Sequence, residues 1–162
     1  MTNSGKAKIT LPTDEQILIT REFAAPKHLV YRAWTTPALV RRWWGGLRGE
    51  MKVVDIDLRV GGKWRYVMLA HGNLELAFHG EYTEIVPNER IVMTHMYEGA
   101  PAPPKGQEVV NTISFSEQNG RTQVQVLGQC PNEAVRDSIA RSGMDEGVQE
   151  QMDLVDELLL EL

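Results

Sequence analysis

The sequence predicts an α+β fold in which a curved antiparallel sheet wraps around a long C-terminal helix. Residues 143–162 carry apolar side chains at spacings of three and four, which is the period of a helix with one apolar face. Residues 51–129 alternate between apolar and polar side chains in runs separated by turn residues, which is typical of strands in a meander. A helix with so one-sided a pattern needs a large apolar partner, and the sheet is the partner that the sequence offers.

The expected elements follow one another in a simple order. A first strand at residues 16–24 leads into two short helices at residues 26–34 and 36–44, each with a proline where the first helical turn tolerates one. Six further strands are expected at residues 51–60, 63–71, 74–86, 90–97, 108–116 and 121–129. The sheet therefore has seven strands, and the two short helices lie between the first and the second. We interpret Gly61-Gly62 as a two-residue hairpin turn.

The bulk properties favour one domain. A chain of 162 residues is long enough to bury a self-sufficient core. We expect residues 1–14 to be a flexible arm and residues 15–162 to form a single domain. The start of the chain is polar and lacks the apolar segment of a signal peptide, and Cys130 is the sole cysteine, so no internal disulfide can form. These features favour a bacterial-type cytoplasmic protein.

Several classes of function are disfavoured by the sequence. The net charge of -5 argues against nucleic acid or an anionic membrane as partner, and no apolar run approaches the ~20 residues of a membrane span. The four histidines are scattered and lack metal-ligand spacing, so we expect no metal. There is no Gly-x-Ser-x-Gly motif, and no serine or cysteine has an evident base nearby in the sequence. We therefore assign no catalytic residue and no cofactor.

The same layout predicts a cavity between the sheet and the C-terminal helix. Two short helices cannot cover a whole sheet face, and a curved sheet crossed by one helix rarely closes along its full length. The residues expected to line this cavity are Trp43, Tyr66, Met68, Phe78, Met93, His95, Ile113, Phe115, Val148, Met152 and Val155. An error of one residue in strand parity would exchange every sheet residue in this set.

Some of these side chains also have a purely structural interpretation. Trp34, Trp43 and Trp44 could wall a binding site or could pack the short helices against the sheet. Because neighbours on a helix differ by about 100° around its axis, Trp43 and Trp44 cannot both face the core. His95 alternates with apolar residues and could be a polar anchor for a ligand. A lone histidine on an apolar face is more often a core residue whose hydrogen bonds are made within the protein.

An ordered set of motifs runs along residues 16–162. They include Phe23-Ala24-Ala25-Pro26, Val30-Tyr31-Arg32-Ala33-Trp34-Thr35, Trp43-Trp44-Gly45, Asp57-Leu58-Arg59-Val60-Gly61-Gly62-Lys63-Trp64-Arg65 and Gly143-Met144-Asp145-Glu146-Gly147. In this order they resemble the activator of heat-shock protein 90 ATPase homologue (AHSA-type) family. The resemblance implies the helix-grip fold of the START-like (SRPBCC) superfamily, whose members commonly bind hydrophobic small molecules beneath the long helix. Eukaryotic activators carry a further N-terminal chaperone-binding domain, for which a chain of this length has no room, so a chaperone interaction is doubtful.

Three functions follow as expectations. The leading one is noncatalytic binding or carriage of a small hydrophobic or aromatic molecule. The second is an enzyme similar to the polyketide cyclases, in which Tyr66, His79, His95 and Asn111 would be the polar groups of the pocket. The third is a protein-interaction module, and edge strands and exposed aromatic side chains favour a homodimer.

Overall fold

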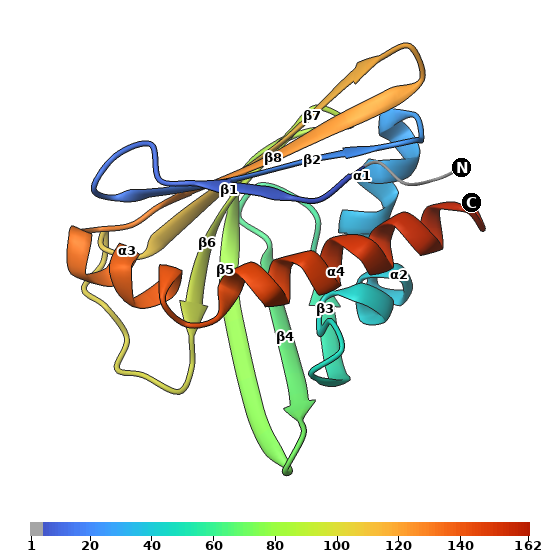
Figure 1. The fold of residues 1–162 in the computed structure, drawn as a ribbon. Helices are drawn as coiled ribbons and strands as arrows, with labels where there is room; N and C mark the ends of the chain where they lie inside the picture. The colour runs from blue at the N-terminus through green and yellow to red at the C-terminus, as the bar shows by residue number, and fades with distance from the viewer. Residues whose placement is uncertain (1–4) are drawn as a thin grey trace.

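The computed structural model describes residues 5–162, which form one antiparallel sheet of eight strands and four helices (Figure 1). The strands are β1 (Lys8–Thr10), β2 (Gln16–Phe23), β3 (Gly49–Ile56), β4 (Lys63–Ala70), β5 (Leu74–Val86), β6 (Arg90–Tyr97), β7 (Val109–Gln118) and β8 (Arg121–Gln129). The helices are α1 (Lys27–Thr35), α2 (Pro37–Trp43), α3 (Glu133–Ala140) and α4 (Met144–Leu159). The predicted α+β class and the helix-grip arrangement are confirmed.

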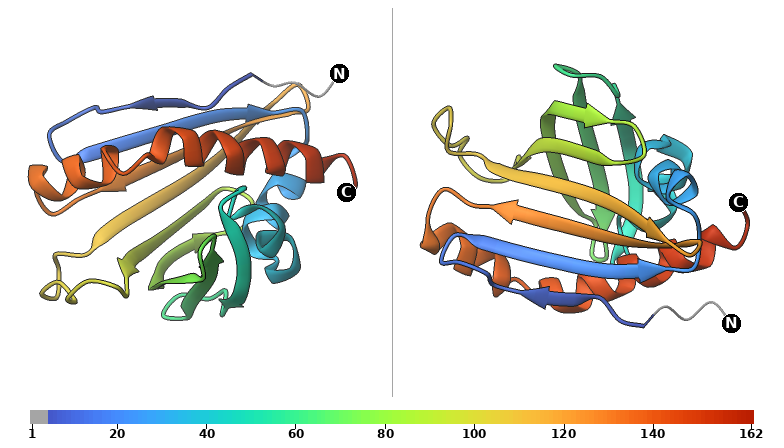
Figure 2. Two further views of the ribbon diagram at one scale, coloured as in Figure 1. Left: turned by 60° about the horizontal axis from the view of Figure 1, so that its bottom comes forward. Right: turned by 90° about the horizontal axis from the view of Figure 1, so that it is seen from above.

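The sheet bends around the C-terminal helix. Its strand order is β1-β2-β8-β7-β6-β5-β4-β3, so α1 and α2 carry the chain from β2 to the far edge of the sheet. Strands β2, β7 and β8 run roughly along α4, whereas β3, β4 and β5 run across it (Figures 1 and 2). Helix α4 therefore faces a hollow in the sheet, with α1 and α2 beside its C-terminal half and α3 before its N-terminal end. No helix within residues 5–162 is long and apolar enough to cross a membrane.

The predicted count of seven strands is wrong by one. Lys8–Thr10, in the segment expected to be a flexible arm, pairs antiparallel with β2. Ala7 is buried, and the side-chain amide of Gln149 on α4 donates to its carbonyl oxygen at 2.8 Å and accepts from its N–H at 3.0 Å. A glutamine amide can replace a strand partner in this way because it carries both donors and an acceptor. Residues 1–4 of the predicted arm lie outside the described residues.

The connection between β3 and β4 also differs from the prediction. Strand β3 ends at Ile56 instead of residue 60, so residues 57–62 form a loop and not a two-residue hairpin turn. Gly61 has a φ of 84°, which glycine adopts readily. A Cβ on Gly62 would lie 2.0 Å from the carbonyl oxygen of Asp57, so only glycine fits there. This loop folds back on itself and therefore needs both glycines. The alternation of apolar residues in the sequence does not indicate such a loop.

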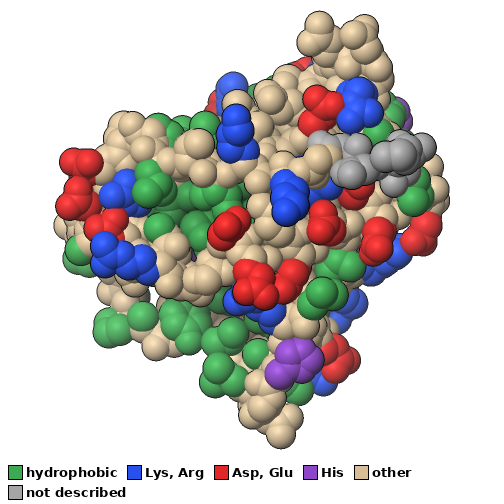
Figure 3. All heavy atoms as spheres, viewed as in Figure 1, with side chains coloured by type: hydrophobic (Ala, Val, Ile, Leu, Met, Phe, Trp, Pro, Cys, Tyr) green, Lys and Arg blue, Asp and Glu red, His purple; other side chains and the backbone are tan. Residues whose placement is uncertain are grey.

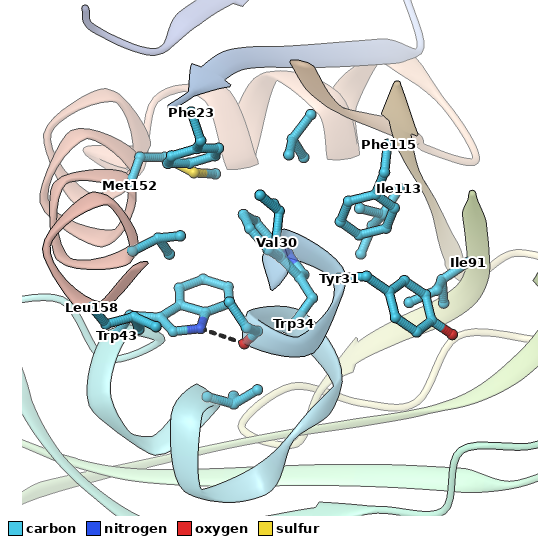
Figure 4. Close-up of a cluster of buried hydrophobic side chains, with 14 of the residues drawn as sticks. Phe23, Val30, Tyr31, Trp34, Trp43, Ile91, Ile113, Phe115, Met152 and Leu158 are labelled. Atoms are coloured by element: carbon cyan, nitrogen blue, oxygen red, sulfur yellow. Dashed lines mark hydrogen bonds between the residues drawn. The ribbon is translucent and has the colours of Figure 1, made fainter. Parts of the chain in front are cut away.

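Side chains fill one end of the interior, where α1 and α2 lie between the sheet and α4 (Figure 4). Phe23 and Val30 are fully buried, and Leu158 of α4 is 1% exposed. The ring of Trp34 meets Phe23 and Phe115 edge-on, with centroid distances of 6.0 and 5.9 Å. Such edge-to-face contacts are favoured by the charge distribution of aromatic rings. We call this region, under the C-terminal half of α4, the closed end.

Candidate ligand-binding site

The other end of the interior contains a cavity of about 290 Å³ between the sheet, α3 and the N-terminal half of α4. Its wall consists of Ile17, Ile19, Trp34, Trp43, Trp44, Tyr66, Tyr82, Ile91, Met93, His95, Val109, Asn111, Ile113, Val126, Gly128, Cys130, Ile139, Met144, Gln151 and Met152. Apolar side chains are visible at the surface on both sides of the C-terminal helices (Figure 3). We call the part of the interior around this cavity the cavity end.

The sheet floor of the cavity is arranged in rows, because residues directly opposite each other on antiparallel strands share one face. One row crosses five strands and consists of Tyr82, Met93, Asn111, Gly128 and Ile17. All five line the cavity. This row carries two polar groups of the floor, with Tyr82 on one side of Met93 and Asn111 on the other. His95 lies two residues along β6 from Met93, on the same face.

The neighbouring rows show where the cavity ends. The next row toward α1 is apolar and consists of Ile91, Ile113, Val126 and Ile19. The row after that consists of Phe115, Val124 and Arg21, all of them buried. Phe115 packs against Tyr31 and Trp34 of α1, so α1 fills the hollow from this row onward. The cavity thus occupies the rows before the one that α1 fills, and Trp34 and Trp43 of the two short helices form part of its wall.

The helical side of the cavity is formed by the end of α2 and by α4, which are far apart in the sequence. Trp43 is buried, and its indole N–H donates to the carbonyl oxygen of Ala33 at 2.8 Å (Figure 4). Trp44 turns to a different side, where its ring meets Tyr66 at 5.1 Å. The amide of Gln151 on α4 donates to the carbonyl oxygen of Trp44. This contact joins α4 to the end of α2 across the cavity wall, and the two tryptophans face different surroundings as their spacing requires.

The polar groups in the wall are neutral at pH 7. Burial, together with a smaller contribution from His79, lowers the pKa of His95 to about 4. Burial raises the pKa of Tyr66 and of Tyr82, whose hydroxyl groups interact with each other. Burial also raises the pKa of the Cys130 thiol. None of the lining residues is Lys, Arg, Asp or Glu, so the described wall of the cavity carries no formal charge.

The structure brings six of the eleven residues expected at the cavity into its wall. These are Trp43, Tyr66, Met93, His95, Ile113 and Met152. Phe115 and Val155 lie instead in the closed end, and Met68 and Val148 are buried in the core outside the wall. Phe78 lies behind the wall, with its ring 5.1 Å from Trp44 and 5.6 Å from His95.

Sequence reasoning missed the wall formed by β2 and β8. Ile17 and Ile19 alternate as strand residues should, and so do Val126 and Gly128. The missing information was that β2 lies next to β8, which places the two alternating segments side by side. Asn111, named only for the enzyme hypothesis, is also in the wall.

His79, named with Asn111 for the enzyme hypothesis, lies on the opposite face of the sheet. There its Nδ1 atom is 2.9 Å from a carboxylate oxygen of Glu98, which also accepts from Arg65 at 2.8 Å. The four polar residues of that hypothesis therefore do not form one site. Within residues 5–162 there is also no group of three His, Cys, Asp or Glu side chains that could hold a metal ion.

A family model described as Activator of Hsp90 ATPase homolog 1-like protein matches residues 24–159. The chain belongs to this family. The resemblance of its motifs is thereby confirmed, and membership in the Activator of Hsp90 ATPase homolog 1-like family is consistent with a general ligand-binding or interaction module. No curated protein matches the sequence.

Solved structures of bacterial proteins share the fold of this family member. A protein from Rhodobacter sphaeroides has a TM-score of 0.88 at 22% identity, over 98% of this chain and 100% of that chain. A Mycobacterium smegmatis protein has a TM-score of 0.83 at 23% identity, over 96% and 97%. A Chromobacterium violaceum protein has a TM-score of 0.77 at 26% identity, over 91% and 98%. These likenesses concern the fold and not the ligand.

Proposed function

We propose that this protein binds a small apolar or aromatic molecule in the cavity under the N-terminal half of α4. The observation that carries the proposal is the uncharged, mostly apolar wall around about 290 Å³ of space, next to a closed end in which side chains fill the interior. Ligand sites in proteins are typically concave and apolar, with a few polar groups that orient the ligand. His95, Asn111 and the two tyrosines are polar groups of this kind.

The electrostatics of the wall favour binding over turnover. A general acid or base works best when its pKa is near the working pH. The pKa of His95 is about 4, and burial raises the pKa of Tyr66 and Tyr82 above their usual value near 10. Each of these groups therefore holds one protonation state around pH 7. This suits carriage of a neutral molecule more than proton transfer.

Two measurements test the proposal. Native mass spectrometry of protein purified from its own host should show a bound small molecule. Thermal denaturation with a panel of lipids, flavonoids and polyketides should show stabilisation, because a ligand at 100 times its Kd adds about 2.7 kcal/mol to the free energy of unfolding. No co-purified molecule together with no shift for any compound would contradict the proposal.

A pair of matched variants places the binding in the cavity. Val126→Phe adds a ring inside the cavity wall, so it should abolish the thermal shift of a compound that binds the wild type. Val92→Phe makes the same change on β6, where Val92 follows Ile91 and so faces the other side of the sheet. The shift should survive Val92→Phe. Survival of the shift in both variants would mean that binding occurs elsewhere, and its loss in both would mean that the fold is disturbed.

A further inference from the structure

The side chains of His95 and Asn111 form a hydrogen-bonded pair within the cavity wall. The side-chain nitrogen of Asn111 lies 3.4 Å from Nδ1 of His95. If the amide donates, Nδ1 accepts, so the neutral ring carries its proton on Nε2 and the amide oxygen of Asn111 is left as an acceptor. If the amide is turned round, its oxygen accepts from Nδ1–H, and Nε2 becomes the free acceptor while the NH₂ group is the free donor. In both cases the pair offers at least one donor and one acceptor for which residues 5–162 supply no partner.

The space beside this pair is kept open by a glycine. Gly128 lies directly opposite Asn111 on β8 and also lines the cavity. A Cβ placed on Gly128 would be 3.2 Å from the amide oxygen of Asn111. Any side chain larger than hydrogen would therefore occupy the space next to that oxygen. The polar group of a ligand can approach Asn111 because position 128 has no side chain.

The surroundings of the pair disfavour a charged ligand. The described wall contains no lysine or arginine, and the low pKa of His95 keeps its ring uncharged at pH 7. A carboxylate placed here would lose its hydration without gaining a counter-charge. A pure hydrocarbon would instead leave the free donor and acceptor of the pair without partners, which is also unfavourable.

We propose that the His95–Asn111 pair selects neutral ligands whose polar end both donates and accepts a hydrogen bond, namely a phenolic or alcoholic hydroxyl or a primary carboxamide. A hydroxyl group can both donate and accept a hydrogen bond, so its chemistry matches the pair whichever way round the amide lies. This inference rests on the proposed function, because it names the class of molecule that the same cavity takes.

Three probes of one shape test it: 2-naphthol, 2-methylnaphthalene and 2-naphthoate, with affinities measured by titration calorimetry on the full chain at pH 7. In a purely apolar cavity the methyl compound would bind more tightly than the naphthol, since it is the more hydrophobic. We expect the reverse order, with 2-naphthol bound about ten- to a hundredfold more tightly than 2-methylnaphthalene, and 2-naphthoate the weakest. Equal affinities, or tighter binding of the methyl compound, would overturn this inference and leave the proposed function standing. No binding by any probe or by the wider panel would contradict both.

Variants assign the preference to the pair. Asn111→Leu keeps a similar volume and should reverse the order of the two neutral probes while 2-methylnaphthalene still binds. His95→Phe keeps a ring at the same position and should weaken 2-naphthol about tenfold without weakening 2-methylnaphthalene. Thr112→Val is the control, because it removes a hydroxyl from the same strand on the opposite face and should change neither affinity. A preference that survives both cavity variants, or that is lost in Tyr82→Phe instead, would show that the assignment to the pair is wrong.

Discussion

The two halves of helix α4 lie over different interiors. Val155 and Leu158, in the C-terminal half, are buried at 0 and 1% exposure against the core that α1 and α2 complete. Met144 and Gln151, in the N-terminal half, and Met152 at the middle of the helix face the cavity. The apolar stripe of the helix is continuous over both halves, so the helix itself does not decide where the cavity lies. What decides it is the reach of the two short helices, which fill the hollow from the row of Phe115 onward.

The two halves also differ in how they are held to the sheet. Arg21 of β2 is 2% exposed, and its guanidinium lies 3.1 Å from Asp153 and 3.7 Å from Asp156 of α4. The same guanidinium lies 5.2 Å above the ring of Phe23. The closed half of α4 is thus tied to β2 by a buried charge. The half over the cavity is held instead by partly exposed contacts, namely the hydrogen bonds of Gln149 to Ala7 and the ion pair of Glu150 with Arg48 at 3.6 Å, and it contains Gly147.

The comparison is tested first by deleting side chains of equal size. Leu158→Ala in the closed end should lower the free energy of unfolding by about 2–5 kcal/mol, because it leaves a cavity in a region that is otherwise filled. Ile139→Ala removes the same number of carbon atoms from a half-buried residue of the cavity wall and should cost at most about 1 kcal/mol. Urea denaturation of both variants provides the measurement. Similar losses would mean that the two ends are packed alike.

The contrast between the ends also shows what could be predicted from the sequence. Periodicity is local, so it revealed the long helix, the strands at residues 74–86 and 90–97, and the side of β6 that carries Met93 and His95. Row neighbours such as Ile17 and Gly128 are over 100 residues apart, and their pairing depends on strand order, which alternation does not encode. The strand at Lys8–Thr10 is held by β2 and, next to it, by the side chain of Gln149, and neither leaves a local signal.

Five residues of the expected cavity set lie outside the wall, for a related reason. Phe115 and Val155 share the faces of Ile113 and Met152, as the sequence pattern predicts, but they lie one step further toward α1. Which residues of a face are covered by another helix is a tertiary property. The sequence therefore predicted the face but not the point along it where the cavity ends.

Adding volume should separate the two ends in the opposite sense. Val155→Phe inserts a ring where the helix meets a filled core and should destabilise the protein by about 1–3 kcal/mol. Val126→Phe makes the same change where space exists, so its cost should be below about 1 kcal/mol. Thermal melts of the two variants against the wild type provide the comparison. A penalty for Val126→Phe as large as that for Val155→Phe would contradict the presence of usable space at the cavity end.

The two ends should also respond to acid with opposite signs. The pKa of His95 falls from 6.5 to about 4 on folding, so below pH 6.5 the unfolded chain takes up a proton that the folded chain does not. The stability that neutral His95 provides is complete above pH 6.5 and is lost as the pH falls toward 4. Between pH 7 and 5 the loss should be about 1–2 kcal/mol, and His95→Gln should remove it. Identical pH profiles for the wild type and His95→Gln would refute this.

At the closed end the relevant group is Asp156. Burial raises its pKa above the ordinary value of 3.8, although Arg21 opposes this effect. The folded chain therefore binds the proton more readily than the unfolded one, and this contribution to stability is present at low pH and is lost as the pH rises through the raised pKa. Asp156→Asn should flatten the profile over the range in which the raised pKa titrates. A profile that Asp156→Asn leaves unchanged would contradict this prediction.

The smallest expected effect concerns the glycine in the half of α4 that covers the cavity. Gly147 lies inside the helix, where glycine is less favourable than alanine by about 0.5–1 kcal/mol. A Cβ at this position would meet the side chain of Arg48 at 3.5 Å, an ordinary contact with a flexible group. Gly147→Ala should therefore raise the free energy of unfolding by about 0.5–1 kcal/mol, and hydrogen exchange should slow in residues 144–152 more than in residues 153–159. Uniform slowing along α4 would mean that the helix opens as one unit, and the difference between its two halves would then lie only in what they cover.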